Sequence, residues 1–259
     1  MAFISHNIQT AVRLNNDAVT HMNSERPEIA ISILVQAAEA ARKALRGARE
    51  CKKGGQQNTA RSFSIDKWIL CSKQEGKNVS NNDQACEDYT SCASTNILMQ
   101  NERRQSERKL PFMFRQAIHI PNSMGSIKED ESSAKISSTV IFNLALAYQL
   151  VGMKGNQISR VSLKKSAKLY ELSFLMERGE EQWSDIALFS MAIFNNLGLI
   201  YNALEQKEKA EKCFKQLLAN LMFMVERKEG LLSAISEFEG FYENTLHLNF
   251  SHVSVVSAA

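Results

Sequence analysis

The residue types that carry out catalysis and bind metals are scattered along this sequence. The five histidines stand far apart, at His6, His21, His119, His247 and His252. The sequence contains no His-Glu-x-x-His pair, no glycine-rich phosphate loop, no Gly-x-Ser-x-Gly turn and no Cys-x-x-Cys pair. We therefore expect no catalytic residues, no metal and no cofactor, and we interpret the protein as a non-enzyme.

Cysteine usage and charge exclude further classes of protein. Five cysteines at irregular spacing do not suit a disulfide framework or a zinc site. The net charge of +3 over 259 residues indicates neither a nucleic-acid-binding nor a membrane surface. The first residues lack a basic region followed by an apolar run, and the longest apolar stretch, Leu217 to Val225, is too short to cross a bilayer. We expect a cytoplasmic protein, with the nucleus as the alternative.

Helical periodicity dominates the apolar pattern. Gly and Pro are scarce, at 11 and 3 residues, and Ile141, Leu144, Ala145 and Tyr148 follow the i, i+3, i+4, i+7 spacing of an amphipathic helix. These features predict an all-α fold. We divide the chain into a first helix pair at 1–48, a low-complexity and largely disordered insertion at 49–135, two further helix pairs with a capping helix at 136–249, and a disordered tail at 250–259.

Two apolar islands interrupt the polar insertion, at 63–70 and 112–120. In the second island Phe112, Phe114, Ile118 and Ile120 share one parity, which is typical of an extended segment lying along a surface. One hypothesis is that this segment packs against the helices. Another is that it occupies the binding face of the protein and inhibits binding.

An internal repeat is clearest from Met191 to about Met224. Large and small residues alternate there at fixed offsets: Phe194, Leu197, Gly198 and Tyr201 at places 4, 7, 8 and 11, then Ala210, Phe214 and Leu217 at places 20, 24 and 27. This pattern resembles the tetratricopeptide repeat, although Leu217 stands where that family usually has Ala. Small residues at places 8 and 20 let two antiparallel helices approach closely, and the large ones fill the space between helices.

Two weaker units share these offsets. One begins at Ser138 and uses Ala145, Tyr148, Ser166 and Tyr170, with a longer turn between its helices. The other is the first in the chain, with Leu14, Ala18, His21, Ala30 and Leu34 at the corresponding places. The resemblance implies antiparallel helix pairs stacked as a short right-handed solenoid, with the 49–135 insertion between the first pair and the second.

The resemblance also implies a concave groove lined by the first helix of each pair. The candidate partner-binding residues in it are Asn15, Asn16, Asn143, Leu146, Asn195, Asn196, Leu199 and Asn202. Asn16, Asn143 and Asn196 all fall at place 6. Because an amide both donates and accepts hydrogen bonds, a ladder of such residues can bind the N–H and C=O groups of an extended peptide. The alternative is that these amides bond only to neighbouring backbone within the stack.

The sequence therefore favours a scaffold or adaptor that binds an extended segment of another protein or peptide. A helical enzyme with an unrecognised site and a self-assembling structural protein stay open as alternatives. We expect neither nucleic acid nor membrane as a partner. The partner's identity and the oligomeric state are not contained in these patterns.

Overall fold

The regular elements of this protein are helices. The computed structural model describes residues 2–52, 111–121, 129–154, 158–176, 183–227 and 239–246, and within these ranges it contains helices and no strand, which confirms the all-α prediction. The long helices are α1 (Ala2–Asn23), α2 (Pro27–Lys52), α5 (Glu129–Gly152), α6 (Arg160–Met176), α7 (Trp183–Ala203) and α8 (Lys207–Arg227). A short helix follows at 239–246.

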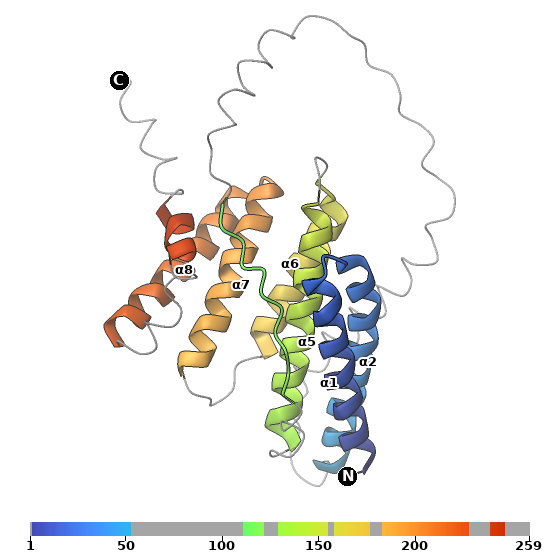
Figure 1. The fold of residues 1–259 in the computed structure, drawn as a ribbon. Coiled ribbons are helices and arrows are strands. Elements are labelled where there is room, and N and C mark those ends of the chain that lie inside the picture. Colours follow the sequence, from blue (N-terminus) through green and yellow to red (C-terminus); the bar gives the residue numbers. More distant parts are fainter. Residues whose placement is uncertain are drawn as a thin grey trace, which may run out of the picture.

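Helices that are neighbours in sequence pack in pairs. Helix α1 contacts α2, α5 contacts α6, and α7 contacts α8. Successive pairs also touch, because α1 and α2 pack against α5, and α6 packs against α7 (Figure 1). The first pair therefore lies directly on the second, although residues 53–110 separate α2 from the next described segment.

Two of the pairs turn back in the same way. Glu25 after α1 and Glu205 after α7 have positive φ angles of 57° and 63°, the left-handed conformation that commonly ends a helix. The same backbone hydrogen bond closes each helix: Arg26 N–H to the His21 carbonyl at 3.0 Å, and Gln206 N–H to the Tyr201 carbonyl at 2.8 Å. The backbone thus repeats the offset that the sequence pattern indicated between the first and last units.

The close approach of α7 and α8 depends on Gly198. A Cβ atom added there would lie 2.5 Å from Cζ of Phe214, whose ring is almost fully buried. The other two pairs also have small residues at these places: Ala18 and Ala30 are fully buried, and Ser166 donates a hydrogen bond of 2.7 Å to the Ala145 carbonyl. Small side chains at these places are what let the helices approach.

Gly198→Ala should destabilise the protein by about 1–3 kcal/mol, because the Phe214 ring has to move out of a packed position. In an unhindered helix interior the same change would stabilise by about 1 kcal/mol. Urea unfolding followed by circular dichroism measures the difference. In a Phe214→Leu background the change to alanine should be neutral or stabilising; an equal loss in both backgrounds would contradict the contact.

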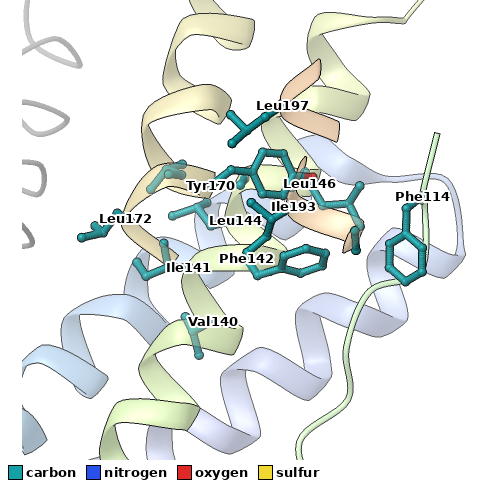
Figure 2. Packing of buried hydrophobic residues seen from close by; sticks show 14 of the residues in the cluster. Phe114, Val140, Ile141, Phe142, Leu144, Leu146, Tyr170, Leu172, Ile193 and Leu197 are labelled. Atoms are coloured by element: carbon teal, nitrogen blue, oxygen red, sulfur yellow. The ribbon is translucent and has the colours of Figure 1, made fainter. Parts of the chain in front are cut away.

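Helix α5 is the central helix. Its stretch Ser133–Gly152 is long and apolar enough to cross a membrane by length and composition, and 72% of that window is buried inside the protein. Contacts on several sides account for this composition, because a helix surrounded by other helices is apolar all round. Figure 2 shows its residues Ile141, Phe142, Leu144 and Leu146 packed with Tyr170 of α6 and Ile193 of α7.

The helix boundaries differ from the predicted divisions at two places. Helix α2 continues to Lys52 rather than ending near 48, since the first glycine pair after it is Gly54-Gly55. Helix α5 begins at Glu129 rather than 136. The predicted island at 63–70, the tail at 250–259 and the predicted capping helix outside 239–246 lie outside the described residues.

Candidate functional site: an asparagine ladder

An extended segment, residues 111–121, crosses one face of the helices. It belongs to no helix and runs over α7 and α5 toward α1 (Figure 1). Pro111 and Pro121 bound it, and Pro121 disfavours a helical conformation at Ile120, the residue before it. The segment thus lies within the predicted insertion, and the structure places it on the face that carries the asparagines.

At four residues of this segment, one asparagine binds both the backbone N–H and the backbone C=O. In every case the amide oxygen accepts from the N–H and the amide nitrogen donates to the C=O of the same residue. The pairs, with the N–H and then the C=O distance, are Asn244 with Phe112 (3.1 and 2.6 Å), Asn196 with Phe114 (3.1 and 2.9 Å), Asn143 with Ile118 (2.8 and 2.8 Å) and Asn16 with Ile120 (2.9 and 2.8 Å).

Two further asparagines tie these amides to one another. Asn15 donates to the Ile118 carbonyl at 3.0 Å and accepts from Asn143 at 2.8 Å. Asn195 forms the equivalent bonds at the Phe112 end of the segment: it donates to the Phe112 carbonyl at 3.1 Å and accepts from Asn244 at 2.6 Å. We call these six residues, Asn15, Asn16, Asn143, Asn195, Asn196 and Asn244, the asparagine ladder.

The ladder is interrupted in the middle by Phe142. Phe142, on α5, occupies place 5 of its repeat unit. The same place is taken by Asn15 in the unit of α1 and by Asn195 in the unit of α7. Its buried ring lies edge-on to Phe114, with 6.3 Å between the ring centroids. Accordingly the bound residues are four apart across this gap, at 114 and 118, and two apart elsewhere. Figure 2 shows Phe142 among the helices with Phe114 coming from the segment beside them.

Tyr170 provides the hydrogen-bond acceptor that a linking asparagine at the place of Phe142 would provide. Its hydroxyl accepts from the Asn196 amide at 2.9 Å and donates to Oε1 of Gln149 at 2.9 Å. Burial raises the pKa of Tyr170 far above its ordinary value, against the weaker opposite effect of the bond from Asn196. The hydroxyl therefore keeps the proton that it donates to Gln149. Its bond with the Asn196 amide fixes the orientation of that side chain.

Tyr170→Phe should lower the free energy of unfolding by about 1–3 kcal/mol, because a buried Gln149 oxygen and one Asn196 N–H lose their partner. Chemical denaturation measures this loss. Tyr242→Phe is the matched control: Tyr242 is 52% exposed, and its change should stay within about 0.5 kcal/mol. Equal effects of the two substitutions would show that the hydroxyl of Tyr170 does not hold the ladder.

The side chains of the bound residues face inward and are apolar. Phe114 and Ile120 are buried, and the Phe112 ring packs edge-on against Phe241 at 5.4 Å. Between them, Arg115 and His119 are exposed. Among the described residues, none forms a hydrogen bond with the N–H groups of Met113, Arg115, Ala117 and His119. The face thus contacts backbone and apolar side chains, and it leaves the side chains of Arg115, Gln116 and His119 in solvent, while Met113 and Ala117 are half-buried.

The predicted groove residues divide into three groups. Asn15, Asn16, Asn143, Asn195 and Asn196 contact the segment, as described above. Leu146 and Leu199 are buried in the apolar core beneath it. Asn202 is exposed, and no side-chain hydrogen bond joins it to any other described residue. Among the predicted repeat positions, Tyr148 is half-buried and the others are buried: Ala18, Ala30, Ala145, Tyr170, Leu197, Gly198, Tyr201, Ala210 and Phe214.

Asn244 was missed by sequence reasoning. It lies on the short helix 239–246, which the sequence predicted only as a cap. The available signal is Gly240: an added Cβ would lie 2.3 Å from the ring of Phe112, so the glycine marks the close approach of another part of the chain. A single glycine and a single asparagine in a short helix do not reveal that signal without the fold.

Among the described residues, no charged side chain forms a hydrogen bond with the asparagine ladder. In the part of the chain that the structure describes, no group of three or more His, Cys, Asp or Glu side chains could hold a metal ion. Burial, with the nearby Glu171 charge, raises the pKa of Cys213 to about 12, so its thiol stays protonated at neutral pH. What the face offers is neutral hydrogen bonding and apolar contact.

No protein-family model matches this chain, and no curated protein or solved structure is detectably similar to it.

Proposed function

We propose that this protein is an interaction module, a scaffold or adaptor, whose asparagine ladder binds an extended segment of another protein. The observation that carries the proposal is the set of four residues in segment 111–121 whose N–H and C=O groups are both bound by a single amide. The protein's own segment is thus an example of the kind of ligand that the face accepts.

Backbone binding of this kind suits a general peptide site. Pairing with both backbone groups of alternate residues is what a neighbouring β-strand does for a peptide added to a sheet edge. Here side-chain amides on helices do the same, and specificity then comes from the apolar side chains that face inward. The six amides carry no charge, so the site places no demand on the charge of the exposed ligand positions.

We further propose that the helix pairs form a tetratricopeptide-like solenoid. Three features support this arrangement: each pair contacts the next, the first and last pairs share one turn geometry, and small residues stand where paired helices meet. In such an arrangement the first helices line one face, and α1, α5 and α7 carry five of the six ladder residues.

Peptide binding in trans tests this function. Because the protein's own segment fills the face, we would use a full-length released variant, Phe114→Pro/Ile118→Pro, in which the N–H groups bound by Asn196 and Asn143 are gone. A fluorescent peptide with the sequence of residues 110–122 should bind it saturably, as measured by anisotropy. Far-UV circular dichroism checks that the helices are retained.

Two matched variants in the released background decide the result. Adding Asn143→Ala/Asn196→Ala should abolish binding, whereas adding Asn202→Ala, on the same helix as Asn196 but exposed, should leave it unchanged. A folded released variant that binds no peptide, or one that binds equally well without the two ladder residues, would contradict the proposed function.

A further inference from the structure

We propose that segment 111–121 is a resident competitor, and that a partner binds by displacing it with an extended segment of the same pattern. The pattern is an apolar residue at four positions that lie two, four and two residues apart, as at Phe112, Phe114, Ile118 and Ile120. This inference rests on the proposed function and adds to it the chemical class of the partner and the regulation of the site.

The spacing follows from the helices that carry the amides. An extended chain advances about 3.3 Å per residue, so the eight residue-to-residue intervals from 112 to 120 cover about 26 Å. This length covers three steps, from helix 239–246 to α7, α5 and α1. The two outer steps take about 7 Å each, and the middle step, where Phe142 stands, takes about 13 Å. A ligand must therefore present its bound residues at these intervals.

The amides also exclude certain residues from the ligand. Each of the four bound residues donates its N–H, so proline cannot stand at any of these positions. The inward side chains contact the buried Phe142 and Phe241 rings, so charged residues are disfavoured there. The positions of Arg115, Gln116 and His119 are exposed and accept any residue.

The middle interval is the most specific part of the pattern. Since Phe142 fills the place of a linking asparagine, the ligand has to span the ring with three residues between two bound ones. Removing one of these three would reverse the parity of one half of the ligand. The bound N–H groups and the apolar side chains of that half would then face away from the protein.

The segment competes with a partner for the ladder because it belongs to the same chain as the helices. A covalently attached ligand acts at an effective concentration in the millimolar range. The apparent dissociation constant of a partner is its intrinsic dissociation constant divided by the fraction of molecules whose site is open. Displacement is still accessible, because the contacts of the segment are opposed by the entropy lost when its backbone is ordered.

Comparing the intact chain with the released variant tests the inference. The 110–122 peptide should bind the intact chain at least about tenfold more weakly than the Phe114→Pro/Ile118→Pro variant. A peptide lacking the residue of Gln116 should bind the variant at least about tenfold more weakly than the full peptide. A peptide with serine at the Arg115, Gln116 and His119 positions should bind like the original.

An independent readout uses the intact chain labelled with ¹⁵N. Excess unlabelled peptide should speed the hydrogen exchange of the protein's own Phe114 and Ile118 amides, because the resident segment leaves. If the released variant fails to fold, Phe114→Asp/Ile118→Asp replaces it and this exchange measurement stands unchanged.

The failures are distinguishable. Equal affinity of the intact chain and the released variant, with no change in exchange, would overturn the competition while leaving the proposed function intact. Equal binding of the shortened peptide would overturn the spacing pattern. A folded released variant that binds neither peptide would overturn the proposed function itself, and this inference with it.

Discussion

Replacing Asn143 and Asn196 together by alanine should lower the free energy of unfolding by about 3–6 kcal/mol, since each change leaves buried polar groups without a partner. Loss of Asn143 leaves the Ile118 N–H and the side-chain oxygen of Asn15 without a partner, whereas the Ile118 carbonyl keeps its bond from Asn15. Loss of Asn196 leaves both the N–H and the C=O of Phe114 without a partner and removes the donor to Tyr170. Urea unfolding of the full-length chain measures the effect.

The two losses should be less than additive. Once either residue is removed, the segment can lift from the face, and its freed backbone groups then bond to water. Further substitutions in the ladder therefore remove contacts that are already broken, and a double-mutant cycle should show a coupling of about 0.5–3 kcal/mol. Strict additivity would indicate that the two asparagines stabilise separate parts of the protein.

Asn202→Ala is the control for both results. Asn202 lies on α7 with Asn195 and Asn196, but its side chain is exposed, and its replacement should change stability by no more than about 0.5 kcal/mol. A control loss as large as that of the ladder residues would mean that asparagine content, rather than contact with the segment, determines the stability of α7.

Phe142→Ala should destabilise the protein by about 3–5 kcal/mol, the usual cost of removing a fully buried aromatic ring. The ring packs on Tyr170 at 5.4 Å and on Phe189 at 5.1 Å, besides its contact with Phe114. It therefore joins α5, α6 and α7 to the segment. Chemical denaturation gives the total loss.

The same substitution should loosen the segment unevenly. The amide of Phe114, which lies against the ring, should lose more protection from hydrogen exchange than the amide of Ile120, which is bound to α1. Phe142→Leu, which keeps much of the volume, should cost less than about 1.5 kcal/mol. A loss below 1 kcal/mol for the alanine variant would contradict the central place given to this ring.

Much of the fold could be predicted because it depends on local patterns. The 3.6-residue period indicated the helices. At two small positions of the repeat pattern, Gly198 lies against Phe214 of α8 and Ala210 is buried. The parity of Phe112, Phe114, Ile118 and Ile120 likewise indicated an extended segment. These signals lie within a few residues of one another, so one sequence suffices to show them.

The rest depends on contacts between residues far apart in the chain. Asn244 and Phe112 meet only because helix 239–246 lies beside α7, next to the end of the segment at Phe112. Nothing in the local sequence of Phe142 or Tyr170 shows that the first interrupts the ladder and the second replaces the link. Conversely, Asn202 has the residue type and the place of a groove residue, yet the path of the segment leaves its side chain in solvent.

Residue-resolved hydrogen exchange of segment 111–121 in the unaltered protein tests most directly whether the asparagine ladder binds its backbone. The bound amides of Phe112, Phe114, Ile118 and Ile120 should exchange slowly, and those of Met113, Arg115, Ala117 and His119 should exchange fast. This alternation is predicted because only the first set donates to asparagines. Fast exchange along the whole segment, or protection of the second set instead, would contradict the ladder.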